Sequence, residues 1–194
     1  MPVTAQDYFR IVFDIYPVAW DESPFLYRCL NKSREEVALD VNYHQLYTHT
    51  FTSSEPVPKL TLPNPFLRVY RVAYVLNDGK RLFLERKGLN YLYDCKLNLR
   101  YPLYYVVASN REVAFVPTQY NAQKDDKVEV YYCPTLPEMR NLADVDTVLS
   151  DEFRYLVAWR VVMKLAINDT QYQLYDFFRT QYLLELGRFL RGRV

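Results

Sequence analysis

The sequence predicts an α+β protein: N- and C-terminal helical pairs form a four-helix bundle, and an antiparallel β-sandwich or barrel-like region is inserted between them. Apolar residues recur at three- and four-residue spacing at both ends of the chain. Between them, short runs rich in Tyr, Val, Leu and Phe are interrupted by turn signals about every ten residues. We therefore expect residues 1–44 and 137–194 to form the bundle and residues 45–136 to form the β domain.

Two helices are expected within residues 4–42. Thr4 and Asp7 have the spacing of a capping box, in which each side chain hydrogen bonds the backbone of the other residue. Ser23 followed by Pro24 indicates the start of the second helix, because serine caps helix N-termini and proline fits the first helical position.

Six or seven short strands are expected in the middle of the chain. Residues 66–76 and 81–85 are rich in β-branched and aromatic side chains, and Asn77-Asp78-Gly79 between them is a hairpin turn signal. The other strands are 103–108, paired with 112–116 in a second hairpin, and 128–133.

Helical spacing returns near Ser150. This residue is expected to cap a helix whose first turn holds Asp151 and Glu152, where negative charge is favourable. Asn168-Asp169 should end that helix, and Thr170 should start the last one.

Composition favours assembly over catalysis. The chain has 19 tyrosines and 4 glycines among 194 residues, where glycine is ordinarily about 7%. Tyrosine is enriched at protein–protein interfaces, and scarce glycine removes phosphate-binding loops. The net charge of +1 argues against nucleic acid as the main partner. No secretory signal and no apolar run of about 18 residues is found, so no membrane partner is expected.

Catalytic and metal chemistry have no candidate residues, so we expect no enzyme activity, no cofactor and no metal. His44 and His49 should face opposite sides of a strand. The cysteines Cys29, Cys95 and Cys133 are few and widely spaced, which indicates reduced core thiols. The acidic residues Asp144, Asp146, Asp151 and Glu152 lack calcium-loop spacing and are interpreted as a polar linker and a helix start, and Asp125-Asp126 as a loop tip.

The C-terminus is basic and leaves two interpretations open. From Arg179 onward the chain has four arginines and one acidic residue, Glu185. In the first, the arginines are a favourable cationic helix end exposed to solvent. Alternatively, the tail inserts Phe189 and Leu190 into a partner groove while the arginines meet carboxylates or phosphate.

Three stretches resemble a known family. They are residues 23–33 (SPFLYRCLNKS), 62–69 (LPNPFLRV) and 149–159 (LSDEFRYLVAW). In this order, they resemble the head–tail adaptor (connector) proteins of tailed bacteriophages, of the podophage type that includes the tail tubular protein A of T7-like phages. The last stretch is similar to the family's acidic-Phe-Arg-Tyr helix opening.

The resemblance implies a structural virion protein, made in the host cytoplasm and placed at the head–tail interface. It would form a homo-oligomeric ring of twelve copies beneath the portal, join capsid to tail and continue the DNA channel for ejection, without sequence-specific DNA binding. Its partners would be the portal protein and a tail or nozzle protein. The implied portal-docking residues are Tyr182, Leu186, Arg188, Phe189, Leu190, Arg191 and Arg193. The implied tail-facing loop residues are Asn77, Asp78, Lys80, Gln119, Tyr120, Lys124, Asp125, Asp126 and Lys127.

Two alternatives remain at this point. One is another tail component with the same layout, such as a tail-completion, stopper or nozzle-binding subunit. The other is a carbohydrate-binding β module, in which exposed tyrosines on strands would stack on sugars.

Overall fold

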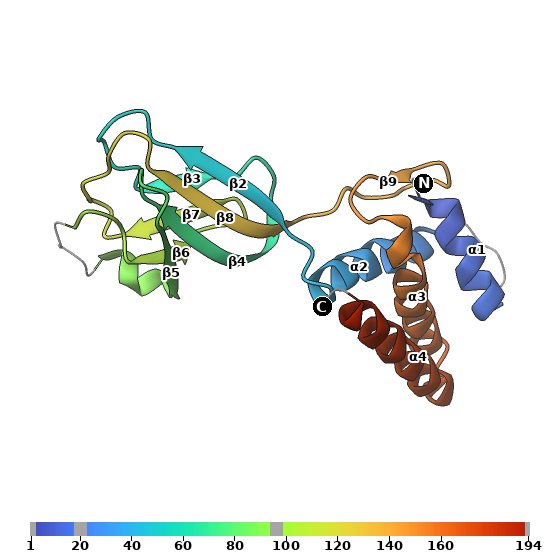
Figure 1. The fold of residues 1–194 in the computed structure, drawn as a ribbon. Helices are drawn as coiled ribbons and strands as arrows, with labels where there is room; N and C mark the ends of the chain where they lie inside the picture. Colours follow the sequence, from blue (N-terminus) through green and yellow to red (C-terminus); the bar gives the residue numbers. More distant parts are fainter. Residues whose placement is uncertain (1–2, 18–22, 94–98, 193–194) are drawn as a thin grey trace. The chain divides into compact units, whose positions relative to one another are not determined.

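The protein folds into two compact units. The computed structural model describes residues 3–17, 23–93 and 99–192. Unit 1 comprises residues 1–43 and 136–194, and unit 2 comprises residues 44–135. Unit 1 is mainly helical and unit 2 is built on a seven-stranded sheet (Figure 1). The expected α+β class is confirmed at this level.

Unit 1 is organised around helix α3 (Arg154–Asn168), whose buried apolar residues cover much of its circumference. It packs against α1 (Ala5–Ile15), α2 (Pro24–Asp40) and α4 (Tyr172–Arg191). The 3-10 turn η2 (Asp151–Phe153) precedes it, and β1 (Val3–Thr4) pairs antiparallel with β9 (Val145–Asp146). The β1–β9 ladder was not predicted, because strands of two residues are too short to show a period.

The starts of α1 and α2 follow the predicted capping chemistry. The Thr4 hydroxyl accepts a hydrogen bond from the Asp7 amide at 3.2 Å, and the Thr4 amide donates to the Asp7 carboxylate at 2.8 Å. The Ser23 hydroxyl accepts from the Leu26 amide at 3.3 Å, with Pro24 at the first helical position. Both predicted caps are confirmed.

Ser150 stands at the N-cap position of η2, with Asp151 and Glu152 in the first turn as predicted, but its side chain makes no capping hydrogen bond. Its hydroxyl donates to the Glu152 carboxylate at 3.0 Å instead of accepting from the backbone. The chain makes η2 first, and α3 begins only at Arg154. The break between α3 and α4 is confirmed, but Thr170 has a left-handed φ of 56° and α4 begins two residues later, at Tyr172.

Unit 2 contains one sheet with the strand order β2-β8-β4-β5-β6-β7-β3. The strands are β2 (Gln45–Thr50), β3 (Lys59–Thr61), β4 (Phe66–Val75), β5 (Arg81–Lys87), β6 (Tyr104–Val107), β7 (Glu112–Val116) and β8 (Lys127–Pro134). Leu60 of β3 and Val128 of β8, from opposite parts of this order, belong to the same hydrophobic cluster. The sheet therefore curls around a single core.

Both predicted hairpins are confirmed. β4 pairs antiparallel with β5 through the Asn77-Asp78-Gly79 turn, where Gly79 has a φ of 88° that a side chain would strain. β6 pairs antiparallel with β7. The expectation of a wholly antiparallel region is wrong, because β5 and β6 run parallel. The connection between them is long and includes the 3-10 turn η1 (Leu89–Tyr93), so the chain can return to the same end of the sheet before β6.

Candidate functional site

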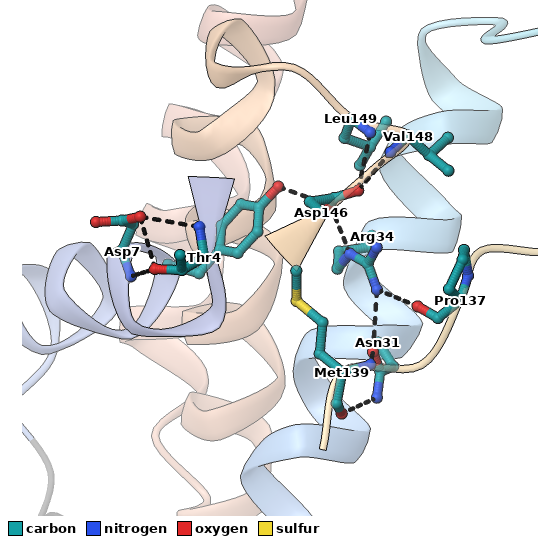
Figure 2. Close-up of polar contacts among 10 residues, drawn as sticks. Thr4, Asp7, Asn31, Arg34, Pro137, Met139, Asp146, Val148 and Leu149 are labelled. Atoms are coloured by element: carbon teal, nitrogen blue, oxygen red, sulfur yellow. Dashed lines mark hydrogen bonds and ion pairs between the residues drawn. The ribbon is translucent and has the colours of Figure 1, made fainter. Parts of the chain in front are cut away.

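A buried carboxylate, Asp146, organises the segment that leads from unit 2 back into the helices (Figure 2). One carboxylate oxygen accepts hydrogen bonds from the Arg34 guanidinium at 2.6 Å and from the Tyr8 hydroxyl at 3.0 Å. The other oxygen accepts from the amides of Val148 and Leu149 at 3.0 and 2.9 Å. All its strong acceptor positions are used, so the charge is compensated although the side chain is fully buried.

Asp146 stays ionised for a definite reason. Burial alone would raise its pKa, but the hydrogen bond and charge of Arg34, with the two backbone amides, hold the pKa below the ordinary value. Burial and the nearby Asp146 carboxylate raise the pKa of Tyr8, so this hydroxyl remains a proton donor. The interpretation of Asp146 as part of a polar linker is therefore wrong. Charge is visible in a sequence, but burial is not.

Arg34 and Asn31 extend the same network along α2. Arg34 also donates to the Pro137 carbonyl at 2.7 Å and to the Asn31 side chain at 3.1 Å. Asn31 donates to the Met139 carbonyl and accepts from the Met139 amide, each at 2.9 Å. These contacts hold residues 137–149 against α2 (Figure 2).

A pocket of about 490 Å³ lies beside this network, between α2 and the segment after unit 2. Its lining combines apolar surface with amide, guanidinium and carboxylate groups, and comprises Pro24, Tyr27, Arg28, Asn31, Glu35, Leu136, Glu138, Arg140 and Asn141. Two of these residues, Arg140 and Glu138, pair at 2.9 Å and are both highly exposed.

The residues predicted for portal docking fall into three environments. Tyr182 is buried, its hydroxyl donates to Asp40 and its ring lies 4.2 Å from the Arg160 guanidinium. It is a packing residue of unit 1 and is not accessible to a partner, which corrects its expected placement. Phe189 packs against Phe153 with ring centroids 4.9 Å apart, and Leu186 is half-buried.

The remaining members of this set are more accessible. Leu190 is 41% exposed. Arg188 pairs with Glu185 of its own helix at 2.9 Å, and Arg191 donates to the Gly187 carbonyl at 3.1 Å. Arg193 lies outside the described residues.

Sequence reasoning missed a second apolar face on α4. Leu183 and Leu184 are about half exposed, at 54% and 50%, and lie on the side opposite Phe178 and Tyr182. Phe177 is 54% exposed and flanks them, with its ring centroid 5.7 Å from that of Phe178. Phe177 and Leu184 are seven residues apart, as are Leu183 and Leu190. This spacing was the signal that could have found the face, since it repeats every two helical turns.

The two predicted tail-facing loops lie together, joined by Asp126. Its carboxylate accepts from the Tyr74 hydroxyl at 2.7 Å, from Arg100 at 2.6 and 3.1 Å, and from the amides of Asn77 and Gln123 at 2.9 Å each. Burial would raise the pKa of Asp126, but Arg100, Tyr74 and the Gln123 amide lower it. Asp126 is thus a buried organising residue, which corrects its interpretation as a loop tip.

Most other members of the loop set are on the surface. The side chains of Asn77, Asp78, Lys80, Gln119, Lys124, Asp125 and Lys127 are exposed. Tyr120 is buried, and its hydroxyl donates to the Val57 carbonyl at 3.0 Å. Tyr120 therefore packs the core of unit 2 and is not available to a partner, a further correction.

The outer face of the sheet presents a second surface that the sequence did not reveal. The Arg71 guanidinium lies over the rings of Tyr131 at 4.2 Å and Phe83 at 5.5 Å. Beside it, Arg81 pairs with Glu129 at 3.1 Å. Phe83 is 62% exposed. Stacked arginine and aromatic groups are typical of protein-binding surfaces.

The two histidines lie against aromatic rings, and the described cysteines are buried. His44 lies against the rings of Tyr70 and Tyr131, and His49 against Phe51. Cys29 and Cys133 are buried, and Cys95 lies outside the described residues. Within the part of the chain that the structure describes, no group of three or more His, Cys, Asp or Glu is placed to hold a metal ion.

Comparison with known proteins gave no assignment: no protein-family model matches the chain, and a search of curated proteins found no match. Among the described helices, none combines the length and apolar character needed to cross a membrane.

Proposed function

We propose that the protein is a structural, non-catalytic subunit of a phage head–tail adaptor ring, bound beneath the portal and continuous with the DNA channel. The observation that carries the proposal is the outward apolar face of α4, which ends in arginines. A face of this kind is more typical of an assembly subunit than of a chain that acts alone. The resemblance of the sequence to podophage adaptors supplies the identity of the assembly.

The proposal assigns different contacts to the two units. The C-terminal part of α4, with Leu190, Arg188 and Arg193, docks on the portal and adjoining copies. The exposed loops 77–80 and 119–127, which Asp126 holds together, contact the tail or nozzle protein. The proposal includes the finer description of the fold, a four-helix bundle with a sandwich- or barrel-like β unit.

Portal binding tests the proposal most directly. A truncation after Glu185 would also remove Phe189, which packs on Phe153, so charge variants separate docking from folding more cleanly. Arg188→Gln with Arg193→Gln should lower capture by purified portal at least about tenfold, since each charge-assisted contact contributes about 1.5–3 kcal/mol.

Arg10→Gln, an exposed arginine on α1, is the matched control and should bind normally. Electron-microscopy class averages of the wild-type chain with portal should show a ring. Failure of the wild-type chain to bind portal, with binding to another adaptor, would favour the alternative tail component.

A further inference from the structure

The sheet of unit 2 ends in two edge strands of very different character. β3, at one end, has three residues, begins with Lys59 and stands between Pro58 and Pro63. Short length, lysine and proline are the features by which natural proteins keep further strands from adding to an edge. β2, at the other end, has six residues, and the sequence from 41 to 54 contains no Lys, Arg, Asp, Glu or Pro. The β2 edge therefore lacks these protective features.

The outer edge of β2 presents the backbone groups of three residues. Phe51 directly follows β2, and its amide donates to the carbonyl of Asp126, which directly precedes β8, at 2.9 Å. Successive residues of a strand turn their N–H and C=O groups to opposite edges, so every second residue back from Phe51 also faces β8. The backbone groups of Leu46, Thr48 and Thr50 therefore point away from β8, and we call these three residues the open edge.

No strand pairs with the open edge in the part of the chain that the structure describes. There, β2 pairs with β8 alone, and the two end strands of the curled sheet, β2 and β3, are not paired with each other. β2 keeps register with β8 over all six residues, without a bulge to twist the edge away. Leu46 is 51% exposed, and the side chains of Thr48 and Thr50 are exposed. The open edge is thus a regular and accessible template for one more strand.

We infer that the open edge binds an extended segment of another protein, which adds beside β2 as an antiparallel strand. A row of amide and carbonyl groups is matched along its length by another extended backbone, so the occupant is a polypeptide. Antiparallel pairing is the more stable of the two directions per residue. The paired part of the segment is uncharged, because no residue of β2 offers a counter-charge.

The side chains of β2 determine which segment fits. Residues opposite each other in an antiparallel pair point to the same face of the sheet and contact each other. Thr48 and Thr50 favour threonine opposite them, and Leu46 favours an apolar residue. On the other face, Tyr47 packs against the core of unit 2 and His49 is half-buried, so apolar residues opposite them extend that core. Read antiparallel to β2, the preferred segment is Thr-Val-Thr-Val-Leu.

The open edge reaches the loop that the proposed function assigns to the tail or nozzle protein. Phe51 joins the end of β2 to that loop through the Asp126 carbonyl. If the proposed function holds, the added strand is supplied by that protein. The pairing itself does not rest on the proposed function.

A fluorescent peptide of this sequence, with blocked ends, tests the inference on the purified full chain. N-methyl groups on its two valines, whose amides face away from β2, prevent a second peptide from adding to the first. It should bind by fluorescence anisotropy and slow the amide hydrogen exchange of residues 45–50. An isomer with the methyl groups on its two threonines should bind at least about tenfold more weakly, because each methyl removes a hydrogen bond to the open edge.

Two substitutions at Thr48 separate the backbone from the side chain. Thr48→Pro removes an amide that faces the open edge, and proline is tolerated in edge strands at such positions. This variant should bind the valine-methylated peptide at least about tenfold more weakly. Thr48→Val keeps the amide, is the matched control and should bind the peptide normally. Unchanged amide hydrogen exchange in β4 and β8 would show that the proline variant is folded.

Equal affinity of the two peptide isomers, or no binding of either at millimolar concentration, would overturn the inference even if the proline variant failed to fold. A folded proline variant with wild-type affinity would do the same. If Thr48→Pro lowered the mass of the chain alone in light scattering, the open edge would serve a second copy, which overturns its assignment to another protein. Portal capture is measured separately through Arg188 and Arg193, so a chain that binds portal but not the peptide would contradict only this inference.

Discussion

Both units contain a buried aspartate paired with an arginine, but the arginine is much more deeply buried in unit 1 than in unit 2. Each holds one fully buried aspartate bound to an arginine at 2.6 Å and to a tyrosine hydroxyl. In unit 1 the arginine, Arg34, is only 1% exposed, whereas in unit 2 the side chain of Arg100 is 31% exposed. Asp146 pairs with a residue 112 positions away, and Asp126 with one 26 positions away.

This difference shows what each ion pair does. The Arg34–Asp146 pair joins the chain segments that precede and follow unit 2, so it defines the tertiary structure of the helical unit. The Arg100–Asp126 pair fixes neighbouring loops within the β unit. Loss of one partner should cost more free energy in the Arg34–Asp146 pair, because water cannot reach and solvate the charge that is left buried.

The largest expected effect comes from Arg34→Met, which leaves Asp146 buried without its cation. Unit 1 should lose about 3–5 kcal/mol of unfolding free energy. Trp159 lies in α3 of unit 1 and the sequence of unit 2 has no tryptophan, so tryptophan fluorescence during urea unfolding reports unit 1. The double variant Arg34→Met with Asp146→Leu should recover part of the loss. A loss below about 1 kcal/mol in the single variant would mean that the network is not closed in solution.

Arg100→Met should have a smaller effect, about 1–3 kcal/mol, because water reaches Asp126 when the partly exposed arginine is removed, and the Tyr74 hydroxyl still donates to the Asp126 carboxylate. Amide hydrogen exchange in β4 and β8 is the measurement, and faster exchange there is the expected result. The tryptophan unfolding transition of unit 1 should not move. An equal loss from both arginine variants would remove the proposed distinction between the two units.

The smallest expected difference between the two units is in how their unfolding free energies fall in acid. The folded pKa values of Asp146 and Asp126 are both lowered, so their stabilisation is complete above the ordinary aspartate pKa of about 3.9 and is lost as pH falls through the lowered values. Stability should thus be flat above about pH 5 and decline below about pH 4. Asp146→Asn should flatten the decline seen by tryptophan fluorescence and leave the exchange of β4 unchanged. If the stability of this variant declined in acid as steeply as that of the wild type, other carboxylates would be responsible for the decline.

Local chemistry was predictable where one short segment determines it. The Thr4–Asp7 box, the Ser23-Pro24 start and the turn at Gly79 each depend on neighbouring residues alone. The parallel pairing of β5 with β6 was not predictable, because alternation of side chains gives a strand but not the direction of its neighbour.

The candidate surfaces were predicted only in part, for a related reason. Asp146 and Asp126 have the same sequence signature as solvent-exposed acidic residues, and only the fold places them inside. Helix α4 has apolar residues on both faces, so its period could not show whether Tyr182 or Leu184 points inward. The exposed loops were easier to predict, since turn residues are rarely buried.

The contacts of Asn31 and Arg34 with Pro137 and Met139 have an evolutionary consequence. They anchor the helical unit at the point where the chain returns from unit 2, using only atoms of unit 1. The inserted segment can therefore be exchanged, lengthened or shortened at low energetic cost to the helices, because the free energy of closing a loop rises only slowly with its length. The scaffold is suited to rapid diversification of the inserted β unit, which is nearly half of the chain.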